Sequence, residues 1–278
     1  MTTSLQELAR LLAASKFEII PLKNAASRAR HLPHDSTVSV IASPAKDIDA
    51  TLTMAEELQE LGLKVIPHLA ARMIQDQAQL QKLLARMGEA GMDQTLVIGG
   101  DATDPGDFKD APQLLAAMAD ISHGVSQIGI AGYPEGHPLI SDQSLQTAMA
   151  VKAPHASYIT TQMCFDVSSI VTWIREIRAA GIELPVYVGI PGLVDPVRLA
   201  SIGVRIGVGA SVRYVLKNRS FLWKLLRPGP YEPSKLALGI AEACAAEDLG
   251  IRGFHIFTFN EIEPTVRWWR DELDRAGG

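Results

Sequence analysis

The sequence predicts a closed barrel of eight parallel strands, each followed by a helix. Three observations support this fold class. Short apolar runs alternate with segments of helical periodicity about eight times along the 278 residues. The joins between a helix and the next strand are short and often contain glycine. The Gly-x-Gly-x-x-Gly fingerprint of the competing doubly wound sheet is absent. Because such a barrel typically takes ~250 residues, we expect residues 1–278 to form a single domain.

The eight predicted strands share one composition. Each is short and apolar and is bounded by glycine, proline or polar residues, which is typical of strands buried on both faces of a parallel sheet. They are Phe17–Ile20, Thr37–Ile41, Lys64–His68, Thr95–Ile98, Gln127–Ala131, Ser157–Thr161, Val186–Gly189 and Gly253–Phe257.

Between the strands, apolar residues recur at spacings of three and four, the period of an amphipathic helix. The clearest predicted helices are Ile48–Leu61, Gln75–Ala90 and Ser168–Ala180, the last with Asp166 as its N-cap. Two more, Asp195–Ser201 and Ser211–Leu225, would form an insertion between strands seven and eight.

Composition and charge exclude several classes of protein. The hydrophobic fraction of 47% and the charged fraction of 21% exclude wholesale disorder. The formal charge of −5 and the lack of a basic run exclude a dedicated nucleic-acid surface. No apolar stretch reaches the ~18 residues of a membrane span, and the N-terminus does not resemble a signal peptide. Cys164 and Cys244 lack metal-ligand spacing, so we expect a cytoplasmic protein with reduced thiols and no metal site.

In such a barrel, the residues that follow the carboxyl ends of the strands converge at one mouth. Glu18 lies in an apolar run near the end of strand one. Poor solvation there would favour the protonated carboxyl and suit a general acid. A structural carboxylate that pairs with Lys23 is an equal alternative.

Other polar residues at the mouth are more ambiguous. Asp101 follows two glycines and serves either a ligand or an Asx turn. Gln162 can face the amide-like edge of a heterocycle or cap the backbone. His68 and His137 are each either a ligand or a buried structural histidine, and they give only weak support for zinc. Strand eight leads to Thr258 and Asn260 at the same mouth.

Ordered motifs along nearly the whole chain resemble one family, the methylenetetrahydrofolate reductases. Phe17-Glu-Ile-Ile-Pro-Leu-Lys23 is similar to the family's Phe-Glu-Phe-Phe-Pro-Pro-Lys, and the family's Ala-Gly-Tyr-Pro-Glu-Gly-His-Pro stands intact at 131–138. Further matches are Thr160-Thr-Gln-Met-Cys-Phe-Asp166, residues 180–186, and Gly253-Phe-His-Ile-Phe-Thr-Phe-Asn260. The resemblance is strongest in the motifs of strands five and six.

This resemblance implies an enzyme of (β/α)₈ fold that reduces 5,10-methylenetetrahydrofolate to 5-methyltetrahydrofolate with NAD(P)H. Glu18 matches the family's acid, which opens the methylene bridge to an iminium. The folate would contact Asp101, Gln162, Phe165 and Tyr133. A cofactor would contact His68, Gly100, Tyr133, Glu135, His137 and Asp142.

The chain departs from the family where the family binds FAD. Ile41 replaces a threonine beside the flavin ring, and Gly99 replaces an arginine. Met149 stands at a position of phosphate-binding cations, with Lys152 displaced by three residues. Three interpretations stay open: direct hydride transfer from NAD(P)H without flavin, FAD held by altered contacts, or a paralogue that binds tetrahydrofolate for another reaction or as a partner subunit. Neither nucleic acid nor membrane is expected as a partner, and a homo-oligomer is compatible with the sequence.

Overall fold

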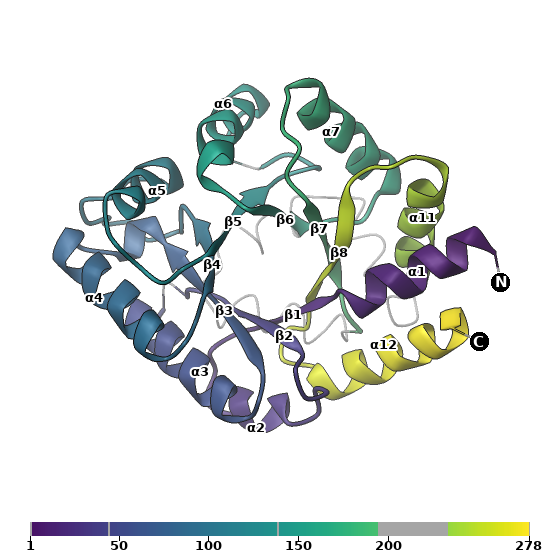
Figure 1. The fold of residues 1–278 in the computed structure, drawn as a ribbon, viewed down its shortest axis with the longest axis horizontal. Coiled ribbons are helices and arrows are strands. Elements are labelled where there is room, and N and C mark those ends of the chain that lie inside the picture. The colour runs from purple at the N-terminus through teal and green to yellow at the C-terminus, as the bar shows by residue number, and fades with distance from the viewer. Residues whose placement is uncertain (1, 44, 138, 194–232, 278) are drawn as a thin grey trace.

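The computed structural model describes residues 2–43, 45–137, 139–193 and 233–277, which form a closed barrel of eight parallel strands in sequence order (Figure 1). The predicted fold class is therefore confirmed. The two helices expected at 195–201 and 211–225 lie outside the described residues. Every hydrogen-bonded strand pair is parallel, including β1 with β8, which closes the barrel.

Each predicted strand is present, with ends displaced by at most a few residues. The strands are β1 (Lys16–Ile19), β2 (Thr37–Val40), β3 (Lys64–Ala70), β4 (Gln94–Ile98), β5 (Gln127–Gly132), β6 (Tyr158–Met163), β7 (Val186–Pro191) and β8 (Ile251–Phe257).

The described helices surround the barrel (Figure 1). They are α1 (Thr3–Ala13), α2 (Ala25–Ala29), α3 (Ile48–Glu60), α4 (Gln77–Glu89), α5 (Ala111–Ala119), α6 (Asp142–Lys152), α7 (Val167–Ala179), α11 (Pro233–Ala246) and α12 (Ile262–Gly277), with short 3₁₀ turns at Ala71–Met73 and Ala153–His155. The predicted N-cap of α7 is confirmed, because the carboxylate of Asp166 accepts a hydrogen bond from the amide of Ser169. None of these helices is long and apolar enough to cross a membrane.

Alternation along the strands sends one set of side chains outward to the helices and the other into the barrel. Phe17 of β1 points outward, where its ring meets the edge of Trp269 on α12 at 5.7 Å between centroids. The indole nitrogen of Trp269 donates to the carbonyl of Leu12 at the end of α1. These contacts fasten the first and last helices beside β1. Because Phe17 points outward, its neighbours Lys16 and Glu18 point into the barrel.

Side chains fill the amino end of the barrel interior. The ammonium of Lys16 lies 3.6 Å from the ring centroid of Tyr158 and 3.7 Å from that of Tyr187. Burial lowers the pKa of Lys16 to about 7. The two aromatic faces compensate part of the cost of burying this amine. With the amino end packed, polar chemistry is concentrated at the carboxyl ends of the strands.

Candidate active site

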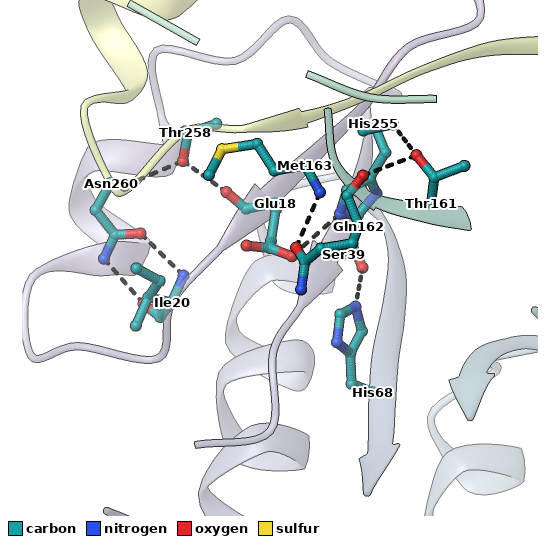
Figure 2. Close-up of polar contacts among 11 residues, drawn as sticks. Glu18, Ile20, Ser39, His68, Thr161, Gln162, Met163, His255, Thr258 and Asn260 are labelled. Atoms are coloured by element: carbon teal, nitrogen blue, oxygen red, sulfur yellow. Dashed lines mark hydrogen bonds and ion pairs between the residues drawn. The ribbon is translucent and has the colours of Figure 1, made fainter. Parts of the chain in front are cut away.

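The carboxyl of Glu18 forms the centre of the polar cluster at the barrel mouth (Figure 2). Its side chain is 12% exposed, and its Oε2 lies 3.1 Å from Nε2 of His255. β1 and β8 are neighbours in the barrel, so residues about 240 positions apart in the chain meet there. The carboxyl of Glu18 is thus paired with the imidazole of His255. Sequence analysis considered Lys23 as the partner and overlooked this histidine.

The segment after β8 holds the backbone around Glu18. The hydroxyl of Thr258 donates to the carbonyl of Glu18 at 2.6 Å. The side chain of Asn260 accepts from the amide of Ile20 and donates to its carbonyl, both at 2.9 Å (Figure 2). Asn260 has a φ of 60°, a left-handed conformation that asparagine tolerates better than most residues. Thr258 and Asn260 therefore fix the position from which Glu18 reaches into the mouth.

His68 of β3 is buried and lies two strands along the barrel from Glu18, with β2 between them. Its Nε2 is 2.5 Å from the hydroxyl of Ser39 on β2, and its ring centroid is 6.4 Å from that of His255. Burial, with a smaller contribution from the proximity of His255, lowers the pKa of His68 to about 3. His68 is therefore neutral at physiological pH and can interact with a ligand only as a neutral hydrogen-bonding group.

The loop after β4 carries Asp101 and is fixed by contacts with Ala70 and Arg72. Gly100 has a φ of +83°, and a Cβ at this position would lie 2.9 Å from the Cβ of Ala70. Arg72 donates from Nε to the carbonyl of Ala102 at 2.7 Å and from its backbone amide to the carbonyl of Gly99. The conformation and close packing of Gly100 thus explain this glycine without any ligand, while Arg72 orders the residues on both sides of Asp101.

Tyr133, His137 and Asp101 come together on the far side of the mouth. The rings of Tyr133 and His137 meet edge to face, with 5.2 Å between centroids. Burial, reinforced by the charge of Asp101, raises the pKa of Tyr133 to about 12. Burial lowers the pKa of His137, and Asp101 opposes that shift. The structure therefore places three predicted site residues from two loops beside one another.

Three other predicted residues, Glu135, Gln162 and Asp142, lie in or beside the loops that follow β5 and β6. An oxygen of Glu135 accepts from the amides of Phe165 at 2.6 Å and Asp166 at 2.9 Å, which ties the loop after β5 to the loop after β6. The side-chain oxygen of Gln162 accepts from the amide of Met163 at 2.9 Å, which matches the backbone-capping alternative for this amide. Asp142 begins α6 on the exposed surface, beside Gly136. Their direct contacts with a substrate or cofactor stay predictions.

The positions that would contact FAD offer neither hydroxyls nor available charges. Ile41 is apolar, and a Cβ on Gly99 would meet no atom within 4 Å. Met149 is only 5% exposed. Lys152 is buried and donates to the carbonyl of Ala131 at 2.9 Å, and burial lowers its pKa to about 8. These positions do not fit a flavin held by the family's contacts, because none supplies a free cation for a phosphate or a hydroxyl for the ring.

His255 is the main residue that sequence analysis failed to assign. It lies in the Gly253–Asn260 motif and shares its inward direction with Phe257, whose ring it meets edge to face. One signal in the sequence could have identified it. His255 lies on the last strand, three residues before Thr258 and five before Asn260, and in a closed barrel the last strand is next to the strand of Glu18. Among the described residues, no group of three or more histidines, cysteines or carboxylates could hold a metal ion.

Comparisons with known proteins show which family the sequence matches. The chain matches the family model described as methylenetetrahydrofolate reductase over residues 21–201, roughly two thirds of its length. It is 30% identical over 116 residues to methylenetetrahydrofolate reductase 1 of Schizosaccharomyces pombe, covering 38% of this chain and 19% of that protein. It is 29% identical over 148 residues to methylenetetrahydrofolate reductase 2 of Saccharomyces cerevisiae, covering 47% of this chain and 24% of that protein. The matched segments thus span at most a quarter of these relatives.

Proposed function

Because the chain belongs to the methylenetetrahydrofolate reductase family, we propose that it reduces 5,10-methylenetetrahydrofolate to 5-methyltetrahydrofolate with NAD(P)H. Glu18 is the general acid in this proposal. Its proton goes to one of the two nitrogens that share the methylene carbon, the bond from that nitrogen to the carbon breaks, and an iminium forms on the other nitrogen. A hydride from the nicotinamide then reduces the iminium carbon to a methyl group.

The observation that carries the proposal is the placement of Glu18. A carboxyl that is mostly buried, faces the barrel mouth and has both its oxygen and its backbone held by β8 is well positioned for proton transfer. The matched family segment begins three residues after Glu18. The acid role therefore rests on the motif around Glu18 and on this geometry rather than on the family match.

Asp101, Tyr133, Gln162 and Phe165 are the proposed folate contacts. They surround the same mouth, and Asp101 lies close enough to Tyr133 and His137 to influence the proton affinity of both. A carboxylate beside a buried phenol can accept hydrogen bonds from the amino and ring N–H groups of a pterin. The open space at Gly99 is the proposed seat of the nicotinamide.

Direct hydride transfer without flavin follows from the substituted positions. Two lost charge-assisted phosphate contacts would weaken FAD binding by roughly 1.5–3 kcal/mol each. The same substitutions favour a second candidate function, a paralogue that binds a tetrahydrofolate without reducing it. Retention of Glu18 with Asp101 and Gln162 supports the reductase, since a protein that only binds folate has no need of a buried acid.

The purified protein tests these candidates directly. It is assayed with methylenetetrahydrofolate and either NADH or NADPH, with and without added FAD, and its visible spectrum is recorded. We expect a colourless protein whose NAD(P)H-dependent activity does not require FAD. A flavin band together with FAD-dependent activity would refute flavin-free transfer. Folate binding without turnover under any of these conditions would favour the paralogue.

A further inference from the structure

His255 has one nitrogen committed to Glu18 and one without a partner. The residue is 1% exposed, and its Nε2 lies 3.1 Å from Oε2 of Glu18. Its Nδ1 is buried, and no hydrogen-bond partner for it occurs among the residues described. The neighbouring Phe257 shows that the barrel accepts an apolar ring here. Filling space therefore does not by itself explain why His255 directs a nitrogen at a carboxyl.

The unpartnered nitrogen decides where the proton of His255 resides. A buried N–H without an acceptor costs about 1–3 kcal/mol, so a proton on Nδ1 is unfavourable. The neutral ring therefore carries its proton on Nε2, which makes Nε2–H the donor and Glu18 the acceptor. A doubly protonated ring would again place an unsatisfied N–H at Nδ1. The arrangement thus suits a neutral histidine that donates its Nε2 proton to the carboxyl of Glu18.

We propose that His255 is a positioning residue that orients the carboxyl of Glu18 and stabilises the carboxylate left after Glu18 has given up its proton. This inference rests on the proposed function, in which Glu18 is the acid. A hydrogen bond that is made to the charged form favours that form. The same hydrogen bond would hold the carboxyl oxygen in one direction toward the substrate.

Within residues 2–193 and 233–277, as far as the structure describes them, the other titratable groups of the barrel interior have partners of their own. The interior groups on the strands packed around it are Lys16 on β1, His68 on β3, Tyr158 on β6 and Tyr187 on β7. Lys16 is engaged by the two tyrosine rings, and His68 by Ser39. The imidazole of His255 makes the polar contact to the carboxyl of Glu18.

Two substitutions separate the hydrogen bond from the bulk of the ring. His255→Phe keeps a planar ring and removes the donor, whereas His255→Gln can place an amide N–H near the position of Nε2. We expect His255→Phe to lower kcat about 10- to 100-fold, the loss that corresponds to one hydrogen bond to a charged group. We also expect it to move the alkaline limb of the pH–rate profile to higher pH. His255→Gln should recover most of both losses.

A second measurement does not depend on turnover. The ionisation of Glu18 is followed against pH in the substrate-free protein by carboxyl carbon-13 NMR, with Glu18→Gln used to assign the resonance and unfolding curves used to confirm folding. We expect Glu18 in His255→Phe to keep its proton to higher pH than in the wild type, and His255→Gln to reverse this change.

Turnover and the Glu18 titration together distinguish failure of the proposed function from failure of the inference about His255. If the wild type lacks reductase activity but the Glu18 titration responds to His255 as expected, the proposed function fails and the contact stands. If His255→Phe folds and leaves both the titration and the pH–rate profile unchanged, the inference about His255 is wrong. It is also wrong if His255→Gln is as damaging as His255→Phe.

Discussion

The two sides of the barrel mouth differ in how their polar groups are arranged. On the side of β1 and β8, Glu18 is held by His255, and its backbone is fixed by Thr258 and Asn260. On the side of β2 to β5, the positions of the family's flavin contacts hold an isoleucine, a glycine and a methionine, and the nearby Lys152 is bonded to the barrel wall. The side of β1 and β8 is dense in hydrogen bonds, whereas the positions that correspond to the family's flavin contacts carry no polar side chain.

Under the proposed function, this difference separates the site of proton transfer from the site of hydride transfer. Opening a methylene bridge needs a proton at a defined place, which requires a rigid acid. Hydride transfer from a nicotinamide needs a flat space and close approach, with few directional contacts to the ring. Under the proposed function, the side of β1 and β8 supplies the rigid acid, and the positions that correspond to the family's flavin contacts lack the groups that a bound flavin would use. The predictions below test each side, in order of decreasing expected effect.

The largest effect is expected at the acid itself. Glu18→Gln removes the proton but keeps the shape and the hydrogen-bonding capacity of the side chain. Because general acid catalysis contributes about 10²–10⁴-fold, reductase kcat should fall by at least about 100-fold while folate binding persists. Steady-state rates and a folate titration measure the two quantities. The exposed Glu263→Gln is the matched control, and turnover retained in Glu18→Gln would contradict the acid role.

Removing the hydrogen bonds that the segment after β8 makes to the backbone near Glu18 should have the next largest effect. Asn260→Ala leaves the amide and carbonyl of Ile20 without their partners, and each unsatisfied buried group costs about 1–3 kcal/mol. We expect lower stability in urea unfolding, together with a drop of about tenfold or more in kcat, because Glu18 is less precisely placed. Thr258→Val should show a smaller version of the same changes. Thr258→Ser keeps the hydroxyl and should resemble the wild type; equal loss in both Thr258 variants would argue against the hydrogen bond.

On the cofactor side, restoring a cation should strengthen flavin binding. Gly99→Arg places a guanidinium where a Cβ meets no atom within 4 Å, so the side chain can be accommodated. One charge-assisted hydrogen bond is worth about 1.5–3 kcal/mol, which predicts roughly tenfold or greater tightening of FAD binding, measured by quenching of flavin fluorescence. Gly88→Arg, at another glycine with open space on the exposed face of α4, controls for added charge. Equal tightening in both variants would show a nonspecific effect.

The smallest effect on activity is expected at His68, which acts instead on the pH dependence of stability. The unfolded chain binds a proton at this histidine near pH 6.5, whereas the folded protein binds it only near pH 3, since the pKa of His68 is lowered to about 3. Lowering the pH from 6.5 toward 3 therefore favours the unfolded chain, by up to ~1.4 kcal/mol per pH unit. Urea unfolding at pH 7 and pH 5 should show a smaller loss in His68→Gln than in the wild type. The exposed His155→Gln should keep the wild-type loss, and an unchanged loss in His68→Gln would contradict the interpretation.

The fold was predictable because its pattern is local and repeated. A run such as Thr95–Ile98, buried on both faces, differs in composition from an amphipathic segment such as 75–90, and eight alternations leave few architectures. The ends of the strands were less predictable. The sequence-based end of the third strand is His68, but β3 continues to Ala70 because pairing with β4, rather than composition, sets where a strand stops.

The site was only partly predictable. Glu18, Asp101 and Gln162 could be named because motifs and strand ends place them at the mouth. The partner of Glu18 could not, because Lys23 is close in the chain whereas His255 lies on the last strand and becomes a neighbour only when the barrel closes. In the same way, only the structure shows that Lys152 is engaged with the carbonyl of Ala131.

By itself, then, the sequence determined the eightfold alternation, the family motifs and the loss of the flavin-contacting residue types, all of which are properties of residue identity and local spacing. The tertiary structure decided which polar groups contact one another. Glu18 contacts His255, and Tyr133 contacts His137. Thr258 and Asn260 bind the backbone of Glu18 and Ile20. The physical reason is that hydrogen bonds depend on distances of a few ångströms between segments far apart in the chain, which closure of the barrel alone establishes.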